Sequence, residues 1–108
     1  MNKYETIFLI EPTDKQEKVD EVIKKYKDLI GGFSDKEIKV DDLGTRKLAY
    51  TVRGFDYANY IVMYFHGKPE NITELERQYR IDDDVIKFMT VRHEEQEFNE
   101  EAEDEEEY

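Results

Sequence analysis

The chain has 108 residues, of which 41% are charged, and it contains no cysteine. This length supports one domain with a modest core. The lack of cysteine excludes disulfides and thiolate metal sites, and we find neither a membrane-spanning apolar run nor a leader with a cleavage site. These features favour a soluble protein of a cytoplasm-like compartment.

The formal net charge of −12 is concentrated at the C-terminal end. Residues 94–108 hold ten acidic residues and no basic ones, which leaves 18 acidic and 16 basic residues in 1–93. The sequence therefore predicts a folded domain over 1–93 and an acidic, disordered C-terminal tail over 94–108. The tail either keeps the chain soluble, the commoner role of a charge run, or holds a basic partner or screens against stray RNA.

The first half of the domain predicts a strand and then a helix. Residues 3–11 form a strand that is apolar on both faces at its centre, as expected of a central strand, and Pro12 ends it. Thr13 and Gln16 have the spacing of a capping box, and Gly31 and Gly32 stop the helix. The helix carries one apolar stripe, formed by Val19, Val22, Ile23, Tyr26, Leu29 and Ile30.

From residue 36 the apolar residues no longer follow helical spacing and instead occupy every second position. The alternation pauses at 42–44 and resumes at Leu48, so the residues allow either one long strand with a bulge or a hairpin turning at 42–44. A turn at 54–58 leads into a strand over 59–66. Pro69 suits the first turn of a second helix, which ends at the acidic run 82–84 before a last strand over 85–92.

The element order β-α-β-β-α-β predicts an α+β fold, the ferredoxin-like split β-α-β (βαββαβ), with a four-stranded antiparallel sheet and two helices on one face. We expect seven strand residues to face the helices: Phe8, Ile10, Ile61, Met63, Phe65, Ile86 and Phe88. The opposite face is also apolar, whereas a solvated face normally alternates to polar residues, so it indicates an interface. The candidate partner-binding residues are Ile7, Leu9, Tyr50, Tyr60, Val62 and Tyr64.

Two segments carry a resemblance to a known family. Residues 44–53 read GTRKLAYTVR, which sets two adjacent cations after a glycine and continues as an alternating strand, and residues 3–12 read KYETIFLIEP. Over roughly residues 2–93 the chain resembles the bacterial small-subunit ribosomal protein six family. That family usually reads Leu-Ala-Tyr-Pro-Ile, and here Thr51 and Val52, both good strand formers, fill the last two places. The resemblance favours the long strand with a bulge.

Basic residues at strand ends, on the bulged strand and at the end of the second helix are candidates for RNA contacts. Arginine suits phosphate through its planar fork, although such cations are often solvated and paired with nearby acids. For Arg46 and Lys47 the family motif favours the RNA role, because a bend at Gly44 can turn them toward a polyanion. The RNA-binding candidates are Lys3, Arg46, Lys47, Arg53, Arg80, Lys87 and Arg92.

The residues argue against an enzyme. His66 and His93 lack a neighbouring nucleophile or metal-ligand spacing, so surface histidines are the better interpretation, and no phosphate-cradling glycine loop is present. Tyr60 and Tyr64 are similar to the stacking surface of RNA-recognition modules, but a protein interface explains them better. We expect no catalytic residue, no metal, no cofactor, no small-molecule substrate and no membrane.

The resemblance implies a structural component of the bacterial small ribosomal subunit, cytoplasmic and ribosome-associated. It implies binding to the central domain of small-subunit ribosomal RNA together with ribosomal protein eighteen of that subunit. The alternative is a small regulatory ferredoxin-like module that binds a metabolite and homodimerises through its open sheet. An acyl-phosphate hydrolase shares the element order but lacks support, because no glycine-rich, arginine-bearing loop is present.

Overall fold

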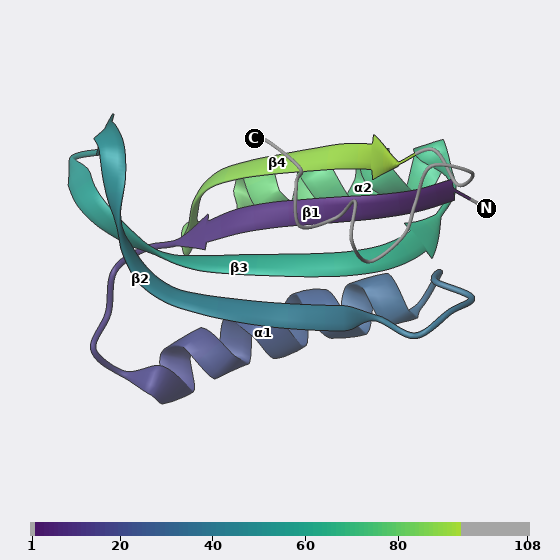
Figure 1. Cartoon of the computed structure of the whole chain (residues 1–108), viewed down its shortest axis with the longest axis horizontal. Coiled ribbons are helices and arrows are strands. Elements are labelled where there is room, and N and C mark those ends of the chain that lie inside the picture. The colour runs from purple at the N-terminus through teal and green to yellow at the C-terminus, as the bar shows by residue number, and fades with distance from the viewer. Residues whose placement is uncertain (1, 94–108) are drawn as a thin grey trace.

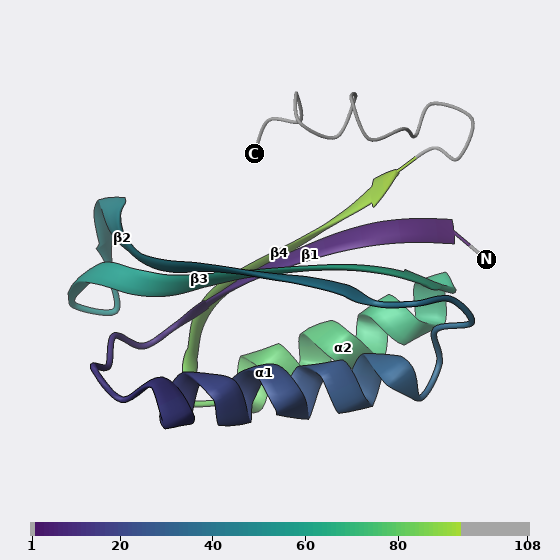
Figure 2. The ribbon, with the colours of Figure 1, turned by 60° about the horizontal axis from the view of Figure 1, so that its bottom comes forward.

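The computed structural model of the chain describes residues 2–93. The strands form one antiparallel sheet in the order β2-β3-β1-β4 (Figure 1), and both helices cover the same face of it (Figure 2). The predicted ferredoxin-like fold is confirmed. The acidic segment 94–108, and with it the predicted domain boundary, lies outside the described residues. The elements in chain order are β1 (Asn2–Ile10), α1 (Gln16–Gly31), β2 (Lys39–Val52), β3 (Phe55–Gly67), α2 (Pro69–Ile81) and β4 (Val85–His93).

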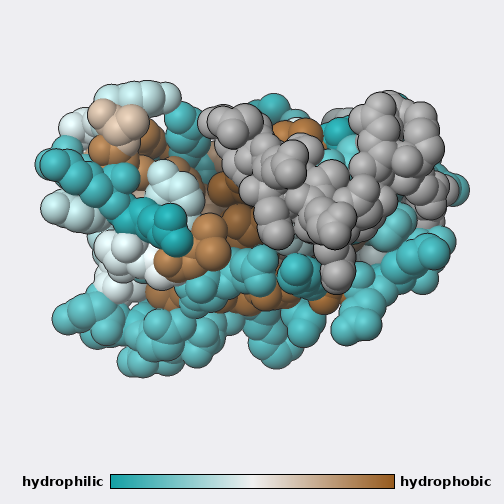
Figure 3. Space-filling model, in the orientation of Figure 1, coloured by the Kyte–Doolittle hydropathy of each residue, from teal (hydrophilic) through white to brown (hydrophobic). Residues whose placement is uncertain are grey.

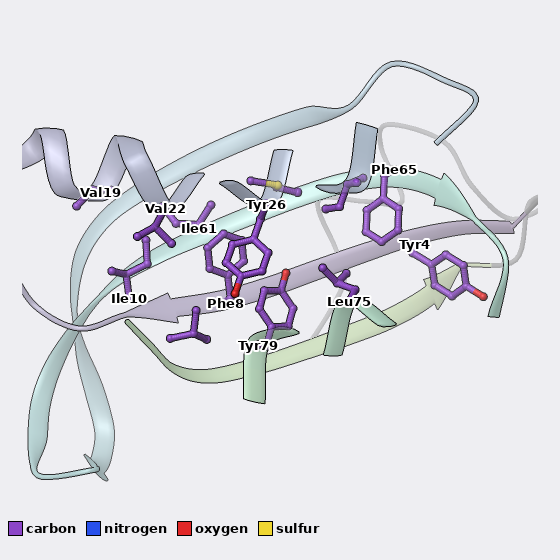
Figure 4. Close-up of a cluster of buried hydrophobic side chains, with 13 residues drawn as sticks. Tyr4, Phe8, Ile10, Val19, Val22, Tyr26, Ile61, Phe65, Leu75 and Tyr79 are labelled. Atoms are coloured by element: carbon purple, nitrogen blue, oxygen red, sulfur yellow. The ribbon is translucent and has the colours of Figure 1, made fainter. Parts of the chain in front are cut away.

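The core between sheet and helices is centred on three fully buried rings (Figure 4). Phe8 of β1 lies 5.2 Å from Tyr26 of α1 and 5.2 Å from Tyr79 of α2, measured between ring centroids. Each tyrosine hydroxyl has a partner: that of Tyr79 lies 3.0 Å from the Thr6 hydroxyl, and that of Tyr26 donates to Asp82 at 2.7 Å. Burial raises the pKa of both tyrosines, so both stay neutral. The central strand is thereby joined to both helices.

The helix ends agree with the sequence except at the start of α1. The predicted capping box of Thr13 and Gln16 is wrong: the N-cap residue is Lys15, and the Thr13 hydroxyl accepts a hydrogen bond from the Lys15 backbone N–H at 3.1 Å. The hydroxyl therefore closes a turn before the helix rather than capping it. Helix α1 ends at Gly31, and α2 begins at Pro69 and ends before the acidic run, as predicted.

Strand β2 is one long strand with a bulge, as the family resemblance favours. Asp42 pairs with Ile61 and Gly44 with Tyr60, so one extra residue of β2 bulges out between them. Gly44 has a φ of 79°, which glycine adopts without strain, and its N–H donates to the Asp42 carboxylate at 2.9 Å. The turn to β3 comes at residues 53–54 rather than at the predicted 54–58.

Beyond the bulge, β2 and β3 continue as a hairpin arm, residues 45–59, that bends to the side of the sheet away from the helices (Figure 2). We call this side the open face. Leu48 and Ala58 of the arm pack there against Leu9 and Ile86. The arm therefore covers one end of the open face with the chain's own residues.

Ile86 was expected to face the helices, and that prediction is wrong. In the pairing of β1 with β4, Ile10 lies opposite Val85 and Leu9 opposite Lys87, so the register shifts by one residue at Ile86. Val85 joins the core under the helices, and Ile86 packs on the open face. Within residues 2–93, neither helix has the length and apolar character needed to cross a membrane.

Candidate RNA and protein interface

The open face presents apolar side chains at its centre. Ile7 of β1 lies between Val62 of β3 and Met89 of β4. Ile7, Tyr60 and Tyr64 are half-buried, and Met89 is 40% exposed. Figure 3 shows hydrophobic surface in the middle of this face, with hydrophilic side chains to its left and below it. The arrangement is an apolar centre with a polar rim, which is the anatomy of a protein–protein interface.

The six candidate partner-binding residues differ in accessibility. Leu9 and Val62 are 5% and 6% exposed, so they lie beneath the accessible surface and offer little contact area to a partner. Leu9 is covered by the hairpin arm. Tyr50 is 65% exposed and stands on the arm rather than at the centre of the sheet. The accessible candidates at the centre are therefore Ile7, Tyr60 and Tyr64.

The seven RNA-binding candidates fall into separate places. Arg46 and Lys47 lie on the hairpin arm, and Arg92 lies opposite Tyr4 near the end of β4. Lys3 lies on β1 with its ammonium group 5.9 Å from the centre of the Tyr64 ring. The remaining three, from the arm, α2 and β4, line one pocket: Arg53, Arg80 and Lys87.

Arg46 and Lys47 are both exposed, but they leave the arm on opposite sides. Arg46 lies across from buried Ala58, and Lys47 lies across from Tyr57, which is 50% exposed. Neighbouring residues of a strand point to opposite faces. Among residues 2–93 the Arg46 guanidinium makes one weak contact, its Nε donating to the Leu43 carbonyl at 3.4 Å. The bend at Gly44 therefore does not turn the two side chains toward one spot, and a polyanion that contacts both must follow the edge of the arm.

Lys39 adds a cation that the sequence reasoning missed. Its ammonium lies 5.3 Å from the centre of the Tyr64 ring, so Lys3 and Lys39 both lie over that tyrosine. Cation–π attraction favours this arrangement. Lys39 lies near Tyr64 because the two residues are paired between β2 and β3, and no motif in the sequence predicts that pairing. The open face thus carries positive charge beside its apolar centre.

His93 is not a surface histidine, so that expectation is wrong. Its side chain is 8% exposed, and its Nε2 lies 2.9 Å from Oε1 of Glu5, whose side chain is 1% exposed. His66 is half-buried on β3. Within residues 2–93, no group of three potential metal ligands gathers in one place. The two residues of the buried pair come from neighbouring strands, so the contact links β1 to β4.

Comparison with known proteins agrees with this geometry. The model of the family described as ribosomal protein S6 matches residues 3–92. The chain is 40% identical over 93 residues to the small ribosomal subunit protein bS6 of Sulfurovum sp. (strain NBC37-1), covering 86% of this chain and 73% of that protein. It is 38% identical to the protein of the same name from Trichlorobacter lovleyi, covering 84% and 75%.

A solved structure extends the match to three dimensions. The crystal structure of 30S ribosomal protein S6 from Thermotoga maritima superposes with a TM-score of 0.79 at 30% sequence identity. The superposition covers 96% of this chain and 95% of that one. The similarity therefore spans the sheet, both helices and the hairpin arm.

Proposed function

Because the chain belongs to the ribosomal protein S6 family, we propose that it is a structural protein of the small ribosomal subunit, located on the ribosome in the cytoplasm. We further propose that it binds the central domain of small-subunit ribosomal RNA together with ribosomal protein eighteen. The family is one of structural proteins, and the chain is accordingly not an enzyme.

The observation that carries the proposal is the apolar centre of the open face beside two cations, of which Lys39 is exposed and Lys3 half-buried. Ile7, Tyr60 and Tyr64 offer an apolar surface to a protein partner, and Lys3 and Lys39 stand next to it. Burial of such a surface supplies free energy at about 25 cal/mol per Å² of apolar area. Arg46 and Lys47 extend along the arm as contacts for phosphates.

The charge of the domain argues that the two ligands bind cooperatively. Residues 1–93 have a net charge of −2, so the release of counterions from RNA gives little affinity to this chain alone. A basic protein partner on the open face would supply the missing positive charge. We therefore expect RNA affinity to rise at least about tenfold when ribosomal protein eighteen is present. Equal RNA affinity with and without that protein would contradict the proposal.

Sedimentation of a cell lysate on sucrose at moderate salt tests the assignment to the ribosome. We expect the chain to travel with the small subunit. The alternative, a metabolite-binding module, predicts a stable homodimer at the top of the gradient, free of nucleic acid. That result would overturn the proposed function.

The double variant Arg46→Glu with Lys47→Glu tests the role of the arm in assembly. Both side chains are exposed, so the free energy of unfolding should change by no more than about 1 kcal/mol. Incorporation into the small subunit should fall, because two phosphate-facing cations become repulsive. Lys27→Glu with Lys36→Glu, two exposed positions in α1 and in the loop between α1 and β2, makes the same change in net charge and serves as the control. Unfolding of the arm variant under native conditions would refute a surface role.

A further inference from the structure

A pocket of about 290 Å³ opens at the outer edge of β4, where three segments distant in sequence meet. Arg53 comes from the tip of the hairpin arm, Arg80 from the end of α2 and Lys87 from β4. The other residues along its wall are apolar or aromatic, namely Tyr79, Val85, Ile86 and Phe88. Within the described part of the chain, three cations and no carboxylate line this pocket. A domain of net charge −2 thus gathers positive charge at one place.

The turn that carries Arg53 favours a different residue. Val52 pairs with Phe55 across a two-residue turn, and both turn residues have positive φ, 51° at Arg53 and 84° at Gly54. Turns of this kind prefer Asn, Asp or Gly at the first position, because an L side chain with a Cβ rarely adopts this conformation. The turn conformation therefore does not explain an arginine at this position, and we look for its role in the interactions of its guanidinium group.

The three cations are weakly compensated within residues 2–93. Arg53 makes no ion pair there, and Arg80 has one acidic neighbour, with 3.8 Å between its Nη2 and Oε1 of Glu76. Lys87 donates to the Tyr50 hydroxyl at 2.7 Å and lies 4.8 Å from the centre of that ring. Two acids close in sequence have other partners, since Asp56 accepts from Thr51 and Asp84 pairs with Lys18. The pocket has capacity for an anion.

We propose that this pocket holds one backbone phosphate of RNA, with Arg53, Arg80 and Lys87 as its donors. The inference rests on the proposed function and deepens it by naming a phosphate site within the RNA interface. Two guanidinium forks and an ammonium, carried by three separate segments, can together donate to the oxygens of one phosphodiester. The apolar wall of Val85 and Phe88 limits water at the bound phosphate and strengthens the attraction.

The variant Arg53→Asn separates folding from binding. Asparagine suits the turn, so the thermal unfolding midpoint should stay the same or rise by a few degrees. RNA affinity, measured with ribosomal protein eighteen present, should fall about tenfold, and the slope of log K against log salt should shrink by about 1. Arg80→Gln should lower RNA affinity by a similar factor. The double variant should lower it by less than the product of the two separate factors, because both side chains contact the same phosphate. Lys27→Gln with Lys36→Gln is the control and should leave affinity unchanged.

A titration with pyrophosphate, followed by NMR on the side-chain Nε–H signals of Arg53 and Arg80, separates a pocket for RNA phosphate from one for a small anion. The inference holds if RNA moves both signals and Arg53→Asn weakens RNA binding. It is overturned if wild-type and Arg53→Asn bind RNA with equal affinity and salt slope, while the proposed function survives that result. If the wild-type chain binds no RNA even with its partner, the proposed function fails. A response to pyrophosphate in that case identifies a small-anion site, which also overturns the inference.

Discussion

Replacement of Asp82 by alanine should lower the free energy of unfolding by about 3 kcal/mol. The Asp82 side chain is 6% exposed and receives three hydrogen bonds: from the Tyr26 hydroxyl at 2.7 Å, from Lys25 at 3.0 Å and from the Asp84 backbone N–H at 2.9 Å. Tyr26 is fully buried, and without Asp82 its hydroxyl retains one long contact, to the Gln78 carbonyl at 3.4 Å. The loss combines broken charge-assisted bonds with a poorly satisfied buried donor.

Urea unfolding of wild-type and variant at neutral pH measures this difference. Asp83→Ala is the matched control, because Asp83 is the next residue, is exposed and makes no ion pair within residues 2–93. Its effect should stay within about 0.5 kcal/mol. A loss below about 1 kcal/mol for Asp82→Ala would mean that the buried carboxylate is not what joins α1 to the end of α2.

The same carboxylate predicts how stability depends on pH. Burial raises the pKa of Asp82, but the bonds from Tyr26, the Asp84 N–H and Lys25 outweigh burial and leave it below the ordinary value of 3.8. A pKa that is lower in the folded state adds stability at pH values above the unfolded pKa. The stability difference between wild-type and Asp82→Ala should therefore be complete above about pH 4 and shrink as the pH falls further. A difference that grows in acid would contradict this account, and unfolding curves between pH 2 and 7 measure it.

The sequence predicts those parts of the fold that local patterns determine. The six elements follow from apolar periodicity. The residues alone allow a hairpin at 42–44 as an alternative to the bulge, and the family resemblance favours the bulge, where Gly44 has a φ of 79° in the structure. The face of Ile86 could not be predicted, because the register shift there depends on how β4 pairs with β1. A shift of one residue exchanges the two faces of a strand.

The candidate site was predictable as a list of residue types but not as an arrangement. Arg53 and Lys87 are 34 residues apart in sequence, and they line one pocket because the hairpin arm bends toward β4 at one end of the open face. His93 is buried through a pair with Glu5, 88 residues earlier in the chain. In the sequence, Asp82 is one of three acids in a polar turn. Its role depends on the hydrogen bond from the Tyr26 hydroxyl of α1, which the sequence does not reveal. In each case the deciding contact joins distant segments, which local patterns do not encode.

Replacement of Met89 by lysine should weaken binding to the protein partner by about 100-fold. Met89 is 40% exposed on the open face, directly across from Ile7 of β1. If ribosomal protein eighteen covers this surface, the new ammonium is buried without a partner and faces a basic protein. The variant itself should fold normally, since the position is open in the free chain and a surface change costs about 1 kcal/mol or less.

Isothermal titration of the full chain with ribosomal protein eighteen measures the effect, and Ile81→Lys is the matched control. Ile81 is also an exposed apolar side chain, 63% exposed, at the end of α2 on the helix side. It should bind the partner like wild-type, because the helix side is not proposed to be covered. Equal losses at both positions would indicate a general effect of added charge. A loss at Ile81 alone would move the protein interface from the open sheet to the helix layer, and it would require a new explanation for the apolar centre around Ile7, Tyr60 and Tyr64.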